Sequence, residues 1–292
     1  MTGLDDWIGR TEQRTDVLHA QPCRFMQATL GREASLTDGD ALPPLWHWLF
    51  FLEAKPLGAL GRDGHPAKGE FLPPVSLPRR MWAGGRFAFH QPLIIGRAAS
   101  KTSTIKNIAE KQGRSGPLCF VTVAHEIHQD GGLCVVEEHD IVYRADPDPD
   151  LHPSGTAPTP IQAPIQAPIQ APIQAPADPA FSEQIQPSEV MLFRYSALTF
   201  NGHRIHYDSD YARRVEGYEG LVFHGPLTAT LLVDLSLRHV GQTPRSFSFR
   251  GTAPLSGLAA FHIQGRNDDE GKTELWARRA DGALAMTAQT VF

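Results

Sequence analysis

The sequence predicts an α+β fold built from two similar modules. Four perfect copies of Ile-Gln-Ala-Pro at residues 161–176 divide the chain into two parts, each of ordinary domain size. In each part an apolar, helix-like run is followed by several segments in which apolar and polar residues alternate. That order is typical of a long antiparallel sheet that covers one buried helix per module.

The repeats predict a Pro-rich linker over residues 146–180. Proline at every fourth position removes backbone donors and disfavours a helix at the preceding residue, so we expect an extended spacer. The number of copies is expected to be neutral for function. The linker separates an N-terminal module, residues 1–145, from a C-terminal module, residues 181–292. A role of the repeat itself in binding a partner is the less favoured alternative.

Each module is expected to hold one buried helix. Residues 42–60 are rich in Leu, Trp and Phe, open with two prolines and end among glycines, which is the punctuation of a helix. Residues 226–240, PLTATLLVDLSLRHV, are apolar on almost every side and predict a core helix. Two such modules could join their sheets into one. Strands are predicted at residues 93–108, 117–128, 132–144, 245–250, 258–266, 273–279 and 283–292.

Composition disfavours several classes of protein. A net charge of -5 argues against general nucleic-acid binding. No apolar run reaches the length of a membrane span, and the acidic, polar start lacks the features of a secretory signal. A cytoplasmic enzyme without nucleic-acid or membrane partners is therefore expected. The cysteines stand in no ligand-like spacing and are expected to pack as small apolar side chains: Cys23, Cys119 and Cys134.

The segment of residues 194–226 carries the densest set of chemically useful side chains. Its sequence is RYSALTFNGHRIHYDSDYARRVEGYEGLVFHGP, and it ends at the predicted core helix. The first turn of a helix offers free backbone N–H groups and a partial positive charge, which suits an active site. Five polar residues fall within 24 positions: Asn201, His203, His206, Asp208 and His224.

This segment resembles the hydratase motif of MaoC-like enoyl-CoA hydratases. There the pattern is Asp-x-Asn-Pro-x-His-x-Asp, followed later by apolar residues and His-Gly, similar to residues 201–208 and 220–226 here. Residues 199–208 are more narrowly similar to the branch of mesaconyl-CoA and itaconyl-CoA hydratases and mitochondrial-type 3-hydroxyacyl-thioester dehydratases. The N-terminal part, with Gly84-Gly85 after Met81-Trp82, resembles the degenerate partner module of double hot-dog members.

The resemblance implies a double (tandem) hot-dog fold in which a long antiparallel sheet wraps around central helices. It implies reversible addition of water to an α,β-unsaturated acyl-CoA thioester, with a short dicarboxylic acyl group such as mesaconyl or itaconyl. The alternatives are a 3-hydroxyacyl-thioester dehydratase of fatty-acid metabolism and a non-catalytic or thioesterase-like acyl-CoA binding protein. No cofactor is expected, because coenzyme A is part of the substrate, and a homodimer is among the assemblies that the resemblance allows.

Two departures from the family pattern affect the catalytic assignment. Thr199 stands where the family has a catalytic Asp, and a hydroxyl is no base near neutral pH. Four residues rather than two separate Asn201 from His206, so the loop between them must bulge. We expect His206 to be the general acid/base and Asn201 to hold the water or the thioester. Asp208 is expected either to orient an imidazole or share the water, or, as an equal alternative, to begin a short helix at residues 210–216, where carboxylates are favoured.

The remaining candidates concern substrate binding. The N–H of Gly225 and its neighbours is expected to form the oxyanion hole, with His224 and Gly220 beside it. Arg204 is a candidate partner for a free carboxylate on the substrate. A small basic patch earlier in the chain also suits a carboxylated or phosphorylated small molecule: Arg79, Arg80 and Arg86. A metal site at His203, His206 and Asp208 is the minority alternative, so no metal is expected.

Overall fold

In the computed structural model, all ten strands of the described residues belong to one antiparallel sheet. The structure describes residues 3–113, 116–146, 172–268 and 271–292. The strand order is β1-β3-β4-β5-β2-β7-β10-β9-β8-β6, so the first five strands form one half and the last five the other. The bounds are β1 Thr11–Val17, β2 Arg79–Phe89, β3 Ala98–Gly113, β4 Gly116–Gln129, β5 Gly132–Arg144, β6 Phe181–Ile185, β7 Ser246–Gly251, β8 Phe261–Asn267, β9 Lys272–Arg278 and β10 Leu284–Val291.

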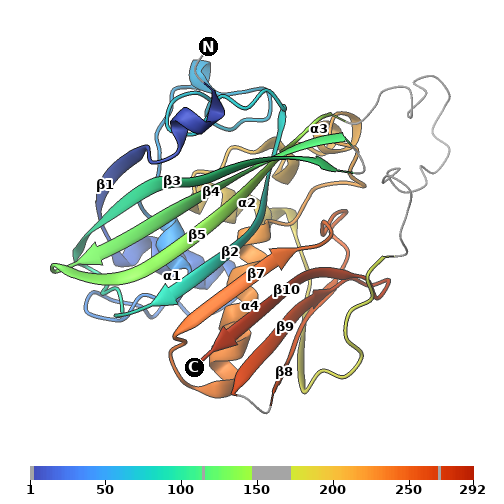
Figure 1. The fold of residues 1–292 in the computed structure, drawn as a ribbon. Helices are drawn as coiled ribbons and strands as arrows, with labels where there is room; N and C mark the ends of the chain where they lie inside the picture. Colours follow the sequence, from blue (N-terminus) through green and yellow to red (C-terminus); the bar gives the residue numbers. More distant parts are fainter. Residues whose placement is uncertain (1–2, 114–115, 147–171, 269–270) are drawn as a thin grey trace.

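The two halves join edge to edge through β2 and β7. Gly84 pairs with Arg250 and Ala88 with Ser246 in antiparallel register, and Figure 1 shows the two strands side by side in the middle of the sheet. The expectation that two modules share one continuous sheet is confirmed. Closing one edge of each half in this way removes two exposed strand edges.

Seven strands lie close to their predicted positions, and three were missed. The strand predicted at residues 93–108 is shifted to β3, five residues later. Of the missed strands, β1 has mostly charged and hydroxyl side chains, and β6 has only five residues. Within β2, two glycines and a register shift between Trp82 and Gly84 interrupt the alternation, which hides the strand from a pattern search.

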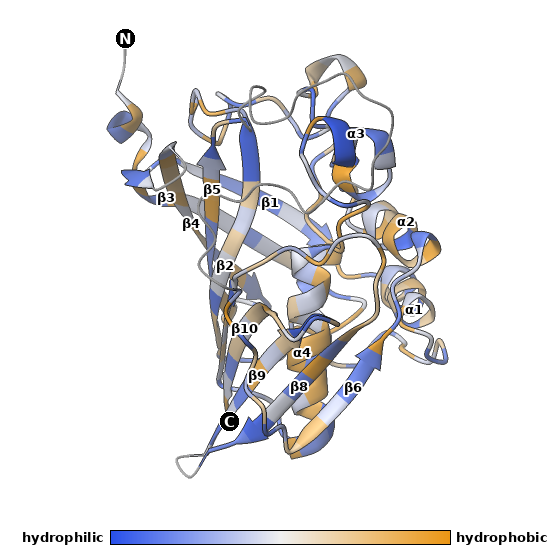
Figure 2. Cartoon of the chain, turned by 90° about the vertical axis from the view of Figure 1, so that its right-hand side faces the viewer, coloured by the Kyte–Doolittle hydropathy of each residue, from blue (hydrophilic) through white to orange (hydrophobic). Residues whose placement is uncertain are grey.

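The helices cover one face of the sheet, as Figure 2 shows from the side. They are α1 Ala20–Thr29, α2 Glu189–Leu198, α3 Ser209–Arg214 and α4 Gly225–Val240, with 3-10 turns η1 Leu4–Trp7, η2 Trp46–Leu49, η3 Leu57–Ala59 and η5 Arg204–His206. The core helix predicted at residues 226–240 is confirmed as α4, and nine of its side chains are buried. Gly241 ends it in the left-handed conformation at φ 72°.

The helix predicted at residues 42–60 is wrong. Only η2 and η3 are helical there, because Leu45 and Phe51 have φ of 69° and 58°, which no α-helix accommodates. The apolar side chains are nevertheless buried, as predicted, with Trp46 3% exposed. The helix of the N-terminal half is α1, which is short, carries a proline in its first turn and buries only one face.

The last Ile-Gln-Ala-Pro copy, residues 173–176, docks against the turn between β9 and β10. Leu284 N donates to Ile173 O at 2.7 Å, and Ala175 N donates to Gly282 O at 3.0 Å. Residues 147–171, most of the predicted linker, lie outside the described residues. All three cysteines are buried, as expected. Within the described ranges, no helix has the length and apolar character needed to cross a membrane.

Candidate active site

His206 ends the short 3-10 turn η5 and lies against the start of α4. Its Nδ1 is 2.7 Å from Val222 O, so this nitrogen carries the proton and Nε2 is left as an acceptor. Burial lowers the pKa of His206 to about 4, against the opposing effect of the Val222 carbonyl. His206 is therefore a neutral imidazole at pH 7 with a free lone pair. Since η5 is a 3-10 turn and not a strand, Asp208 does not share a strand face with it.

His224 stacks directly on His206. The ring centroids are 3.6 Å apart and the planes differ by 19°. His224 occupies the N-cap position of α4, is completely buried, and its Nε2 is 2.9 Å from the hydroxyl of Ser196 on α2. Burial, and then the neighbouring His206 and His203, hold the pKa of His224 well below its usual value. Its Nδ1 has no hydrogen-bond partner among the described residues.

Two further imidazoles extend this stack into a row. His203 lies edge-on to His206 with centroids 5.4 Å apart, and His65 lies 4.2 Å from His203. His65 comes from the N-terminal half, so the row crosses the boundary between the halves. We call the four side chains the histidine row: His65, His203, His206 and His224.

A close backbone contact brings His65 to the row. Arg204 N donates to Asp63 O at 2.9 Å, and a Cβ on Gly64 would lie 2.0 Å from Gly202 O. Gly64 also has φ of 88°, so glycine is required there twice over. Gly202 and His203 account for the lengthened spacing between Asn201 and His206. The expected bulge is thus the segment that docks onto the N-terminal loop.

Asp63 holds His65 in one orientation. His65 Nδ1 is 2.9 Å from Asp63 Oδ2, and His65 N donates to Oδ1 at 3.1 Å. Burial alone would raise the pKa of Asp63, but the hydrogen bonds from His65 outweigh it and hold this carboxyl ionised. Burial and then the charge of Arg80 lower the pKa of His65. The pair is therefore an aspartate and a neutral imidazole.

The first turn of α4 presents backbone N–H groups beside the row. Residue 226 is proline and has no N–H, while Thr228 N already donates to His224 O at 3.0 Å. A Cβ placed on Gly225 would meet no atom within 4 Å, so there is open space next to its peptide. The position suits an oxygen that becomes negatively charged during a reaction.

Four other predicted site residues are engaged within the protein. Asn201 Oδ1 accepts from His203 N at 3.0 Å, which fixes the loop that carries His203. Asp208 caps α3 by accepting from Tyr211 N at 2.9 Å and pairs with Arg204 at 2.7 Å. The Arg204 guanidinium also lies 4.1 Å above the ring of Tyr211. Gly220 packs against Gly257, where a Cβ would come within 3.1 Å of the Cα.

Of the three clustered arginines, only Arg80 has no carboxylate at ion-pair distance in the described part of the chain. Arg79 is buried against Glu216, and Arg86 pairs with Glu138 and Asp140. Arg80 lies opposite Tyr143 in the register of β2 and β5. Its charge affects the pKa values of Asp63, His65 and His203, which places it near one end of the histidine row.

Sequence reasoning missed Asp63, His65 and Ser196. An Asp-Gly-His turn among glycines, residues 61–69, is a signal that could have drawn attention to the first two. Nothing in the sequence places that turn next to residue 203, some 140 positions later. Ser196 lies inside α2, a helix that was not predicted.

Two groups of three potential metal ligands occur among the described residues, with ligand atoms within 4.8 Å of one another. They are Asp63, His65 and His203, and His125, Glu137 and His139. The spacing-based set of His203, His206 and Asp208 does not form such a group. In the second group Glu137 also accepts from His47 Nε2 at 2.9 Å and Trp48 Nε1 at 3.1 Å.

The chain resembles known proteins over almost its whole length. A family model described as hydroxyacyl-thioester dehydratase type 2 matches residues 45–257. A protein of Chloroflexus aurantiacus named mesaconyl-C(4)-CoA hydratase is 46% identical, over 97% of this chain and 95% of its own length. The mitochondrial hydroxyacyl-thioester dehydratase type 2 of Schizosaccharomyces pombe is 27% identical, over 82% of this chain and 84% of its own length.

Solved structures show the same fold. A MaoC-like dehydratase from Phytophthora capsici superposes with a TM-score of 0.70 at 13% identity, covering 100% of this chain and 99% of that one. A Mycobacterium tuberculosis protein described as having a double hotdog fold gives 0.55 at 13% identity, covering 99% and 97%. The predicted double hot-dog fold is thus confirmed. With 73% of its residues inside the family model, the chain belongs to the hydroxyacyl-thioester dehydratase type 2 family and is a hydro-lyase of the hydratase/dehydratase kind.

Proposed function

We propose that this chain reversibly hydrates a short dicarboxylic acyl-CoA of the mesaconyl-C4 type. The observation that carries the proposal is the state of His206: a buried, neutral imidazole whose Nε2 is an acceptor beside the free N–H groups of α4. A water molecule needs such a base, and the thioester oxygen needs such donors. The acyl group is inferred from the Chloroflexus aurantiacus relative and its 46% identity over nearly the whole chain.

In the proposed reaction a single proton moves from the water to His206 and then from His206 to the α-carbon. His206 Nε2 takes a proton from water while the water oxygen bonds to the β-carbon, and the π electrons move to the thioester oxygen. The N–H of Gly225 donates to that oxygen. The C=O bond then re-forms as the α-carbon takes the proton back from His206. Dehydration is the same sequence in reverse, and neither direction needs a cofactor.

Arg80 is our candidate for binding the free carboxylate of the substrate. In a mesaconyl-C4 thioester that carboxylate is attached to the β-carbon, where the water adds, so its partner belongs close to the histidine row. Arg80 is half-buried near His65 and has no carboxylate partner in the described ranges, whereas Arg204 is already bound to Asp208. A guanidinium pairs with a carboxylate through two parallel hydrogen bonds.

The test is a panel of enoyl-CoA thioesters, assayed by the loss of absorbance of the conjugated double bond. We expect mesaconyl-C4-CoA to be hydrated faster than crotonyl-CoA, with product masses that increase by one water. Free thiol is measured in parallel. Release of coenzyme A would identify a thioesterase, and binding with neither signal would identify a non-catalytic protein; either result would contradict the proposal.

A further inference from the structure

We propose that the N-terminal half supplies part of the catalytic machinery: His65, held by Asp63, binds the water that His206 deprotonates. The inference rests on the hydratase activity proposed above and adds a second residue to it. The pair provides a carboxylate-supported group in an active site where the family's Asp position is occupied by Thr199. The hydroxyl of Thr199 is itself unavailable, because it donates to Tyr195 O at 2.8 Å.

The protonation state of His65 follows from its partner. A carboxylate only accepts hydrogen bonds, so the nitrogen 2.9 Å from Asp63 Oδ2 must be protonated. In a neutral ring the other nitrogen, Nε2, is then an acceptor. His206 reaches the same state through Val222 O. The histidine row therefore contains two imidazoles that each present a lone pair, one from each half of the chain.

The two imidazoles lie in one continuous cluster. His203 is between them, with its centroid 4.2 Å from that of His65 and 5.4 Å from that of His206. The side chains of Asp63 and His65 are 15% and 23% exposed, so the pair faces a partly open space rather than the core.

Two acceptors suit a water molecule, which has two O–H bonds to donate. When both bonds are engaged, the two lone pairs of the oxygen have fixed directions, and the water attacks as a positioned nucleophile. The proton on the His206 side moves to Nε2 as the C–O bond forms. His65 keeps its own proton on Nδ1 throughout, and the Asp63 carboxylate offsets the positive charge that appears transiently in the row. Asp63 is a positioning residue that acts through His65.

Local packing explains why this pair stays in place. The loop of residues 61–66 is hydrogen-bonded to itself between Gly61 N and His65 O at 2.7 Å, and to the other half through Arg204 N. The close approach of Gly64 and Gly202 leaves no side chain between the two peptides. A loop with a purely structural task would need this contact, but it would not need a neutral imidazole directed toward the histidine row.

Two single variants separate catalysis from packing. His65→Phe keeps a ring of similar size against His203 and removes both nitrogens. Asp63→Asn lets an amide N–H face Nδ1, which moves the ring proton to Nε2 and turns the acceptor into a donor. We expect each variant to lower kcat about 100-fold or more with KM within about threefold. The double variant should be no slower than the singles, because the residues act as a unit. Exposed His90→Phe is the matched control.

The outcomes separate this inference from the proposed function. Wild-type protein that hydrates no enoyl-CoA defeats the proposed function itself. Active wild type with His65→Phe at nearly full kcat defeats only the role of the pair. Unfolding temperatures are recorded as well, and Asp63→Glu should regain part of the activity; equal losses of stability and activity in all variants would show a structural role. A stoichiometric divalent ion that a chelator removes together with activity would instead assign Asp63, His65 and His203 to a metal centre.

Discussion

The rings of His206 and His224 lie face to face, with centroids 3.6 Å apart and planes 19° apart. Neither ring has a carboxylate hydrogen-bonded to it in the described ranges: His206 is bound to a carbonyl and His224 to a hydroxyl. A positive charge on one ring would therefore lie directly against the other ring, with no carboxylate of the described residues hydrogen-bonded to either of the two. This stack keeps the site neutral at rest and makes any proton that it takes from water easy to pass on.

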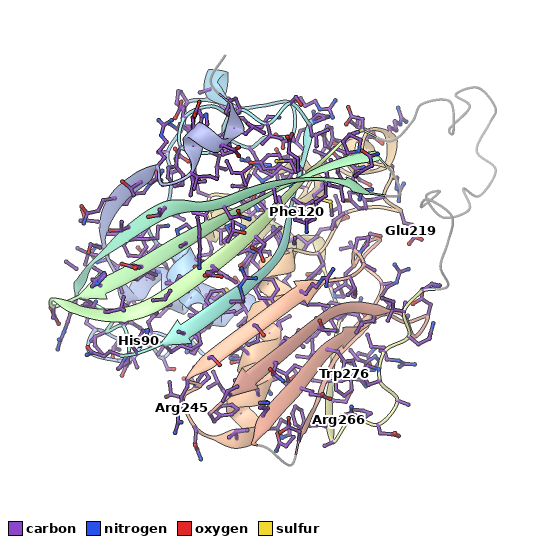
Figure 3. The ribbon with its side chains drawn as sticks, viewed as in Figure 1. His90, Phe120, Glu219, Arg245, Arg266 and Trp276 are labelled. Atoms are coloured by element: carbon purple, nitrogen blue, oxygen red, sulfur yellow. The ribbon has the colours of Figure 1, made fainter. Side chains whose placement is uncertain are left out.

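Replacement of His206 by alanine should abolish most hydration. Loss of a general acid/base group costs about 100- to 10,000-fold in kcat/KM. Steady-state kinetics on mesaconyl-C4-CoA would measure the loss, with His90→Ala as the control. Figure 3 shows His90 at the end of β2, on the opposite side of the molecule from Glu219. Activity above a tenth of wild type in the His206 variant would contradict the proposed base.

Stability should fall as the pH decreases below 6.5. Burial lowers the pKa values of His206 and His139 to about 4 and of His125 to about 3, whereas the same groups in the unfolded chain titrate near 6.5. Between these values the unfolded chain binds protons that the folded chain excludes, so each histidine costs about 1 kcal/mol between pH 7 and 5.5. Urea unfolding at the two pH values measures the sum. Equal stability at both would refute the neutral state of these rings.

The substitution Gly64→Ala, which adds one methyl group, tests whether the close contact between the two halves is needed for stability and activity. In Gly64→Ala the new Cβ would overlap Gly202 O, and φ of 88° adds backbone strain, so the loop should shift away from the row. We expect a loss of about 3 kcal/mol in unfolding free energy and at least tenfold in kcat. Gly9→Ala has nearly the same φ, 87°, with no atom within 4 Å, and should cost only about 1 kcal/mol. Equal effects of the two substitutions would show that the contact is unimportant.

Substrates with and without a free carboxylate should show whether Arg80 or Arg204 binds that carboxylate. We expect Arg80→Gln to lower kcat/KM for mesaconyl-C4-CoA about 10- to 100-fold and to change crotonyl-CoA hydration little, because a hydrogen bond to a charged group contributes about 1.5–3 kcal/mol. Arg204→Ala should leave the preference between the two substrates unchanged, since its partner is Asp208. If Arg204→Ala rather than Arg80→Gln removed the preference for mesaconyl-C4-CoA over crotonyl-CoA, Arg204 would be the partner of the substrate carboxylate, as the sequence predicted.

We expect the first three Ile-Gln-Ala-Pro copies, residues 161–172, to be replaceable, and the last copy, residues 173–176, to contribute to stability. A Gly/Ser segment of equal length in place of residues 161–172 should keep kcat within about twofold, because only reach is required of a spacer. Extending the replacement through residue 176 removes the Ile173 side chain and perturbs the segment that bonds to Leu284 and Gly282, and should cost about 1 kcal/mol. Thermal unfolding and the hydration assay report both effects. Full loss of activity with the first replacement would favour a binding role for the repeat.

The sequence predicts those parts of the fold that have an unbroken local pattern. The helix α4 is apolar on nearly every side, and apolar and polar residues alternate along β4 and β5 over thirteen or more residues. The local sequence pattern is therefore enough to predict these elements. Residues 42–60 are apolar but have left-handed backbone at Leu45 and Phe51, which composition does not reveal. The glycines and register shift in β2 hide a strand in the same way.

The candidate site divides along similar lines. His206 and His224 follow from a short motif, because both belong to one stretch of chain next to one helix. The partnership of His65 with His203 depends on how two halves dock, and that contact lies between residues far apart in the sequence. The pairing of Asp208 with Arg204 is likewise a feature of the folded loop that the sequence did not predict. The place of Asp208 at the start of α3 is local and agrees with the helix-start alternative.

Because the Gly64–Gly202 contact brings His65 to the histidine row, activity reports whether the two halves of the protein have docked correctly. A C-terminal half produced alone would contain the motif and α4 but would lack His65 and Asp63. Mixing separately produced halves would restore turnover only in molecules where the two peptides meet. Turnover in such a mixture would thus be proportional to the number of correctly joined pairs, whereas in the single chain every molecule carries both halves of the site.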